Sequence, residues 1–138
     1  MRITQLQGAY AVARLPADAP LPAGMLDGAG FRTVSRTSDE LSVVAPEQDV
    51  LRTGPTELLK VELGWTIFKI EGPLNFAETG IVAGLAGTLA SIQVPLFVVS
   101  TYDTDYILLK TDHAPRAAAA WEASGHSLAM CAGQATGE

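Results

Sequence analysis

The chain has few of the residues that metal sites, disulfides and nucleophilic catalysis require. Its 138 residues include 1 cysteine and 2 histidines. Cys131 has no second cysteine to pair with, so the reducing cytoplasm is the expected compartment. Zinc sites need several His or Cys ligands at short spacing, and a nucleophile needs a base within reach. The sequence therefore predicts no catalytic residues, no metal and no cofactor, and the protein is not expected to be an enzyme.

Positive charge is also scarce. Lys and Arg number 9 against 15 Asp and Glu, which gives a formal net charge of −6 and leaves no basic run. Nucleic acids and anionic membranes are bound through clustered Lys and Arg, so neither is an expected partner. The first ten residues contain Arg2 without an apolar block after it, so we expect no signal peptide.

One long stretch, from Thr79 to Tyr102, has no charged residue at all. It is long enough to span a bilayer, but Gln93 is polar and Pro95 ends any helix. Apolar residues within it recur at spacings of four, four and three: Ile81, Leu85, Leu89 and Ile92. This spacing predicts a helix with one apolar stripe that lies on a sheet, rather than a membrane span.

The rest of the chain is typical of short strands joined by turns. The expected strands are residues 9–15, 31–36, 41–45, 57–63, 65–71, 96–99, 106–109 and 127–130. Residues 16–30 hold three prolines and three glycines and predict a loop. Gly64 is expected to separate two strands. A short helix is expected to begin at Pro46, and a longer one, at 113–124, to be capped by Asp112 with Pro115 in its first turn.

Two segments suggest an internal repeat. Residues 31–44 (FRTVSRTSDELSVV) align at a constant offset with residues 96–109 (LFVVSTYDTDYILL). Each reads as a strand, a serine, a polar turn with acidic residues near its end, and a second strand, although any two hairpins share some of these features. The connection between the first two strands is shorter in the first half, so its helix should be truncated there.

The best-defined motifs resemble those of a known family. Glu78-Thr79-Gly80, followed by Ile-Val-Ala-Gly-Leu, resembles the helix start of ACT domains, which are small βαββαβ modules that bind amino acids in metabolic regulators. Thr79 stands where that family usually has proline. The stretches Glu71-Gly72-Pro73-Leu74-x-Phe76-x-x-Thr79-Gly80 and Ser100-Thr101-Tyr102-x-Thr104-Asp105-Tyr106 resemble the CASTOR-like branch of tandem ACT amino-acid sensors.

This resemblance covers residues 10–130 and implies an α+β fold of two tandem ferredoxin-like ACT units. The N-terminal unit, residues 1–63, would be degenerate, residues 64–131 would form the C-terminal unit, and 132–138 would be a frayed tail. The resemblance also implies a non-catalytic sensor with one ligand site. Its expected residues are Gly72, Pro73, Phe76, Thr79, Gly80, Ile81, Ser100, Thr101, Tyr102, Thr104 and Asp105.

The chemistry of these residues suits an amino acid. Backbone N–H groups at the start of the helix have no intrahelical partners and attract a carboxylate. Gly80 has no Cβ to hinder approach, Asp105 can hold an ammonium or guanidinium group, and Tyr102 can cover an aliphatic stem. The alternative is that Asn75 or Thr79 only caps the helix and Asp105 only shapes its turn.

Assembly is the last expectation. Sheets of this kind expose edges that are unpaired in isolation, so we expect a homodimer or a higher oligomer. A module that has lost its ligand and serves only for dimerisation is the competing hypothesis, and a tightly packed helix start would favour it.

Overall fold

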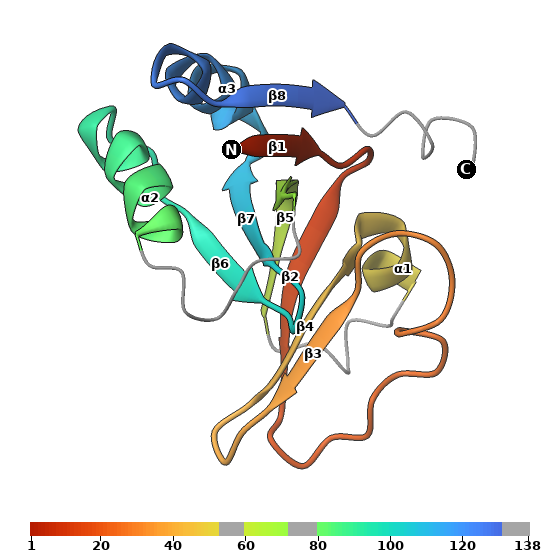
Figure 1. Cartoon of the computed structure of the whole chain (residues 1–138). Helices are drawn as coiled ribbons and strands as arrows, with labels where there is room; N and C mark the ends of the chain where they lie inside the picture. The colour runs from red at the N-terminus through yellow and green to blue at the C-terminus, as the bar shows by residue number, and fades with distance from the viewer. Residues whose placement is uncertain (53–59, 72–79, 131–138) are drawn as a thin grey trace. The chain divides into compact units, whose positions relative to one another are not determined.

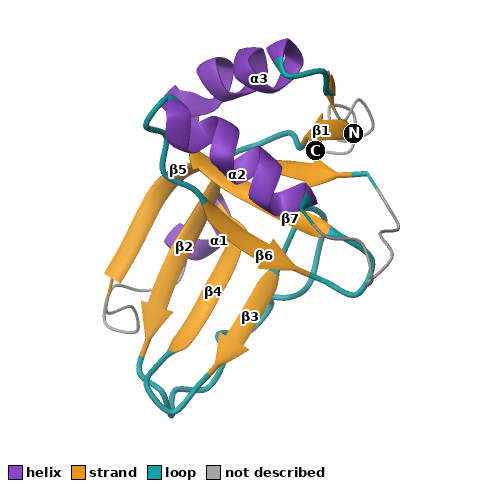
Figure 2. Ribbon diagram, turned by 60° about the vertical axis from the view of Figure 1, so that its left-hand side comes forward, coloured by secondary structure: helices purple, strands orange, loops and turns teal. Residues whose placement is uncertain are grey.

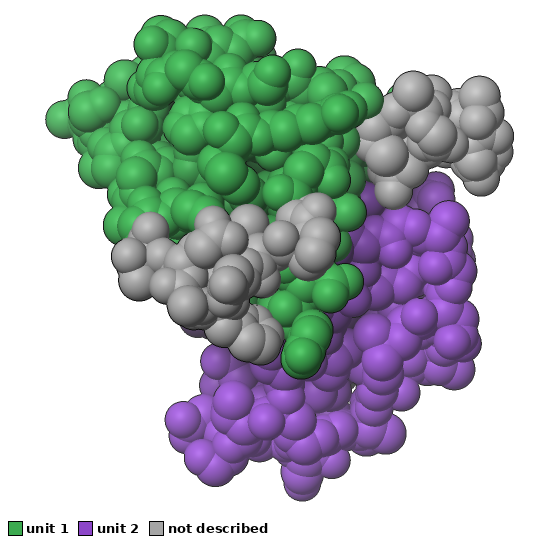
Figure 3. Space-filling view, in the orientation of Figure 1, with its two compact units in different colours: residues 1–7, 66–135 green, residues 8–65, 136–138 purple. Residues whose placement is uncertain are grey.

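A computed structural model describes residues 1–52, 60–71 and 80–130, and it divides into two compact α+β units (Figures 1 and 3). Among the described residues, Met1–Gln7 and the chain from Thr66 onward belong to unit 1, and Gly8–Trp65 forms unit 2. The sequence-based division into repeats at 1–63 and 64–131, with a tail at 132–138, stays a prediction.

Unit 2 is an antiparallel sheet with one short helix. Its strands are β2 (Tyr10–Leu15), β3 (Thr33–Arg36), β4 (Leu41–Pro46) and the first part of β5 (Lys60–Ile70), in the order β3-β4-β2-β5. The helix α1 (Glu47–Arg52) follows β4. Residues 16–32 connect β2 to β3 without a helix, which confirms the expected truncation. The buried core consists of Ala11, Ala13, Leu15, Met25, Leu41, Val43, Ala45 and Val50.

Unit 1 has a five-stranded sheet and two longer helices. In it β6 (Phe97–Ser100), β7 (Asp105–Lys110), the last part of β5, β1 (Arg2–Gln5) and β8 (Ser127–Met130) follow one another in that order. The helices α2 (Ile81–Ser91) and α3 (Ala114–Ala123) both contribute to one core with the sheet (Figure 2). Trp121 lies at its centre: its ring meets Phe68 edge-on at 5.1 Å, and its Nε1 donates to the Leu85 carbonyl at 3.2 Å.

The strand β1 was not predicted from the sequence. It is only four residues long, and polar residues surround its one large apolar side chain, Ile3, which is fully buried. β1 pairs antiparallel with β5 and parallel with β8. Because its hydrogen bonds go to strands more than 60 residues away in sequence, local pattern alone gives little sign of it.

Three local expectations about element boundaries were wrong. β5 runs through Gly64 without a break, and the register of its pairing with β2 shifts between Tyr10 and Val12, which is typical of a bulge. The helix α1 begins at Glu47, and Pro46 instead ends β4. Asp112 lies in the short 3-10 helix η1 (Thr111–His113), and no side chain caps α3.

Other elements agree with the sequence analysis. Pro115 lies in the first turn of α3, and Leu85 and Leu89 of the expected apolar stripe are fully buried in the core below α2. The strand expected to begin at residue 57 is described only from Lys60 on, because 57–59 lie outside the described residues, as does the tail 132–138.

The two hairpins β3–β4 and β6–β7 share one hydrogen-bonding pattern. Arg36 pairs with Leu41 as Ser100 pairs with Asp105, and all four residue pairs of one hairpin recur 64 positions later in the other. The Thr37 amide donates to the Glu40 carbonyl at 2.9 Å, and the Thr101 amide donates to the Thr104 carbonyl at 2.8 Å. The two hairpins therefore share one turn geometry at an offset of 64 residues, one residue less than the offset of the sequence alignment, and the internal repeat itself stays a prediction.

Candidate ligand site in unit 1

The turn between β6 and β7 is fixed to the end of β5. Thr104, only 4% exposed, donates its hydroxyl hydrogen to the Ile70 carbonyl at 2.5 Å. Thr101 closes the turn from the other side, because its hydroxyl donates to the Thr104 carbonyl at 3.1 Å. The turn is therefore held to the last residue of β5 by a buried bond, and this fixes where the residues that flank the turn lie.

Ser100 and Asp105 face each other at the ends of β6 and β7. They form the last pair of the hairpin, and the Ser100 hydroxyl donates to Asp105 Oδ1. Side chains alternate along a strand, so Asp105 lies on the same face as Ile107, which is buried in the core with α2 and α3. A carboxylate can accept several hydrogen bonds, so the bond from Ser100 leaves capacity for a cationic group.

The start of α2 carries backbone N–H groups that have no acceptor within the helix and a partial positive charge. Gly80 is the N-cap residue and makes no side-chain cap bond, and the first intrahelical bond runs from the Gly84 amide to the Gly80 carbonyl at 2.8 Å. The N–H groups that precede Gly84 in the helix have no acceptor within it. A Cβ added at Gly80 would meet no atom of the described residues within 4 Å. Ile81 packs against the core, which fixes the helix start over the sheet.

The expected site residues divide into four groups. Ser100, Thr101, Thr104 and Asp105 are brought together around the β6–β7 turn, and Gly80 and Ile81 form the start of α2. Tyr102, at the tip of the turn, is 82% exposed. Gly72, Pro73, Phe76 and Thr79, like the alternative cap Asn75, lie outside the described residues.

Glu71 is a second carboxylate near the turn, but it lies on the opposite face of the sheet. It accepts a hydrogen bond from the Thr4 hydroxyl at 2.5 Å, and Lys69 Nζ lies 3.8 Å from it. Its amide donates to the Arg2 carbonyl at 2.9 Å. Glu71 therefore anchors β1, a role that sequence reasoning missed because it did not predict that strand.

Unit 2 has neither the carboxylate nor the helix start that make up the candidate site of unit 1. At the position of Asp105 it has Leu41, fully buried in the core, and at the position of Ser100 it has Arg36. The Arg36 guanidinium reaches the Ala17 carbonyl, with Nη1 to O at 2.6 Å. The connection that holds α2 in unit 1 has no helix in unit 2. The sequence alignment hid this difference, because it matched Asp105 with Glu40.

Two further properties concern the described residues as a whole. They contain no group of three or more His, Cys, Asp and Glu side chains placed to hold a metal ion. None of the helices found there has the length and apolar character needed to cross a membrane.

Comparison with protein families gives the class. Residues 60–122 match the ACT domain, and residues 8–53 match a second family that is described as an N-terminal domain. The ACT match covers 60–122, and the ferredoxin-like fold of ACT domains agrees with the strand order and helices of unit 1.

Individual proteins and solved structures are also similar to the chain. The cytosolic arginine sensor for mTORC1 subunit 1 of Mus musculus is 33% identical over 86 residues, which are 59% of this chain and 26% of the sensor. A crystal structure of an Agobacterium tumefaciens protein is 37% identical, with a TM-score of 0.82, and the match covers 94% of this chain and 92% of that one. The regulatory subunit of aspartate kinase from Thermus thermophilus shares the fold at 12% identity, with a TM-score of 0.59 and coverage of 85% and 91%.

The chain therefore spans about a quarter of the sensor's length. Its residues 60–122 match the ACT domain, and the chain is similar to part of a protein named as an arginine sensor.

Proposed function

We propose that unit 1 is a non-catalytic, cytoplasmic module that binds a free amino acid between the start of α2 and the β6–β7 turn. The observation that carries the proposal is the buried bond from Thr104 to Ile70, because it fixes the turn that Asp105 follows on the helix-covered face. A zwitterion has two opposite charges a few ångströms apart, and this end of unit 1 offers a partner for each.

The carboxylate of the ligand would accept hydrogen bonds from the first N–H groups of α2, where the helix dipole also favours negative charge. No atom of the described residues lies within 4 Å of the place where a Cβ of Gly80 would stand, which leaves room for that approach. The cationic group would meet Asp105, whose Oδ1 already accepts the Ser100 hydroxyl. Unit 2 would not bind the same ligand, because Leu41 replaces the carboxylate.

Arginine is the first amino acid to test. The sensor to which the chain is similar is named for arginine, and a guanidinium group can bind a carboxylate through two parallel hydrogen bonds. The downstream partner of that sensor is not part of the proposal, since the match covers only 26% of it.

A thermal-shift screen of the full chain against the twenty amino acids tests the proposal. A ligand at 100 times its Kd adds about 2.7 kcal/mol to the free energy of unfolding. In a protein of this size that raises Tm by about 5–15 °C. If no amino acid at millimolar concentration shifts Tm, unit 1 is not an amino-acid sensor.

A second candidate function is dimerisation through β6. Among the described residues β6 stands at the end of the strand order next to β7, as β3 stands at the end next to β4 in unit 2. Charged residues protect exposed edges from pairing: β3 ends at Arg36 and follows Arg32, whereas residues 95–100 carry no charge. Val98 is also 36% exposed. A second copy would add its β6 antiparallel to the first, and the two uncharged strands would not repel each other.

Amino-acid binding and dimerisation can both occur in one protein, and each of the two proposals can be refuted without the other. A stable homodimer should bury about 1,000 Å² or more, and its presence does not depend on a ligand. A chain that forms a dimer and binds no amino acid would be a structural dimerisation module.

A further inference from the structure

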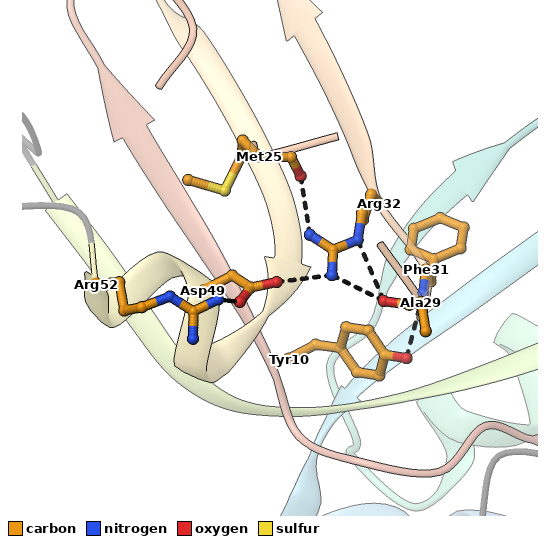
Figure 4. Close-up of polar contacts among 7 residues, drawn as sticks. All are labelled: Tyr10, Met25, Ala29, Phe31, Arg32, Asp49 and Arg52. Carbon is orange, nitrogen blue, oxygen red and sulfur yellow. Dashed lines mark hydrogen bonds and ion pairs between the residues drawn. The ribbon is translucent and has the colours of Figure 1, made fainter. Parts of the chain in front are cut away.

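Unit 2 contains a buried ionic cluster of its own (Figure 4). Arg32 Nη2 lies 2.6 Å from Asp49 Oδ2, and the two side chains are only 8% and 13% exposed. Arg52 also pairs with Asp49 but is largely exposed. The guanidinium of Arg32 is therefore the buried cation of this cluster, and α1 supplies its carboxylate partner.

Backbone carbonyls complete the shell around this guanidinium. Nη1 donates to the Met25 carbonyl at 3.1 Å, and Nε and Nη2 donate to the Ala29 carbonyl at 3.2 and 2.8 Å. Figure 4 shows both carbonyls and the carboxylate directed at the same group. A guanidinium has five N–H donors in a planar fork, and one carboxylate with two carbonyls is a matched set of acceptors for it. We call this set, made of Asp49 and the carbonyls of Met25 and Ala29, the cage.

Most of the cage belongs to the loop 16–32, which stands where unit 1 has α2. In place of a helical ladder that loop has separate turn bonds, from the amides of Ala19, Met25 and Asp27, and Met25 is buried in the core of unit 2. The guanidinium adds a set of bonds that joins these turns to one another and to α1. Gly28 shows how closely it wraps the cation: with φ +106, a Cβ at this position would lie 3.1 Å from Arg32 Nη2. At the 64-residue offset of the two hairpins, Arg32 corresponds to Leu96, which packs against the apolar core of unit 1. The buried cation is therefore a feature of unit 2 alone.

We propose that Arg32 acts as a built-in ligand, a guanidinium group that fills a cation-binding cage from within the chain and keeps the loop 16–32 ordered without any free ligand. The cage is formed by acceptors only, so removal of the arginine leaves a receptor of the right size for a small guanidinium ion, in which Asp49 keeps its pair with the exposed Arg52. Unit 2 then holds its own guanidinium group in the cage at all times, and the cage is not open to a free ligand. The consequence that only unit 1 responds to a free amino acid rests on the proposed function; the cage itself does not.

The test uses the full chain with Arg32→Gly, and ethylguanidinium as the probe. Amide hydrogen exchange reports on the loop, in which the Met25 amide donates to the Pro22 carbonyl and the Asp27 amide to the Gly24 carbonyl. We expect both amides to lose at least tenfold in protection in the variant and to regain it with millimolar ethylguanidinium. Ethylammonium, which lacks the planar fork, should restore little. Adding Asp49→Asn to the Arg32→Gly variant should weaken ethylguanidinium binding at least tenfold.

Two controls keep the test decisive. Arg36→Gly removes an exposed arginine with a single carbonyl partner and should create no site for the probe. If Arg32→Gly does not fold even with the probe, Arg32→Lys replaces it, because lysine keeps the charge next to Asp49 but cannot reach both carbonyls. Its loop amides should lose protection while that of Val50 in α1 is retained. Unchanged loop protection in the folded variant, equal rescue by ethylammonium, or rescue that is indifferent to Asp49→Asn would each overturn the proposal. None of these measurements involves amino-acid binding in unit 1.

Discussion

Replacing Thr104 by valine tests how the candidate site is held in place. Valine has nearly the same shape, so the substitution removes the hydroxyl and little else. The Ile70 carbonyl then loses a buried donor that lies 2.5 Å away. Leaving a buried polar group without that partner costs about 1–3 kcal/mol, which in a protein of this size lowers Tm by about 3–12 °C. Ligand affinity should fall as well, because Asp105 follows directly on the loosened turn.

Chemical denaturation measures the first effect, and calorimetry with an identified ligand measures the second. Thr88→Val is the matched control, because the Thr88 hydroxyl donates to the Gly84 carbonyl of its own helix in an exposed position. A surface change of that kind alters the free energy of unfolding by about 0.5 kcal/mol or less. If Thr104→Val changes stability no more than Thr88→Val does, the turn is not anchored by this bond and our account of how the site is held is wrong.

Two more substitutions test the architecture. Val98→Lys places a charge on β6 and should convert the homodimer to a monomer in light scattering. Ser35→Lys places a charge on β3 and should leave the dimer intact. A monomeric wild type, or a monomeric Ser35→Lys variant, contradicts dimerisation through β6. Ile3→Ala should lower the free energy of unfolding by about 2–5 kcal/mol, because Ile3 is fully buried between β5 and β8. Arg2→Ala is its control, and equal effects of the two would mean that β1 does not pack as described.

The elements that local sequence determines were predicted well. The spacing of Leu85 and Leu89 indicates α2 because one helix face must meet the core, and Pro115 marks the first turn of α3 because proline needs no hydrogen bond there. The β6–β7 hairpin follows from a polar turn between two apolar runs. The ACT fold was predicted from motifs within the same part of the chain.

What the sequence did not reveal depends on distant contacts. β1 becomes a strand because β5 and β8 pair with it on either side, and nothing within residues 2–5 indicates that. The sequence alignment of the two hairpins was one residue out of register because apolar strands align about equally well in either position, and only the matched turn bonds of Thr37 and Thr101 settle it. The buried role of Arg32 is likewise invisible in sequence, since Asp49 and the Met25 and Ala29 carbonyls meet it only in the folded loop.

Isothermal titration calorimetry of the chain with its best amino acid, repeated with two single substitutions, tests the central claim most directly. Asp105→Asn keeps the shape and removes the charge that would face the cationic group, and a charge-assisted hydrogen bond contributes roughly 1.5–3 kcal/mol. Affinity should therefore fall about ten- to a hundredfold. Asp103→Asn, in the exposed turn, should change it little, because a solvated charge pair contributes little, and Gly80→Leu should block binding by bulk at the helix start. If Asp103→Asn is as harmful as Asp105→Asn while Gly80→Leu is harmless, the amino acid binds elsewhere.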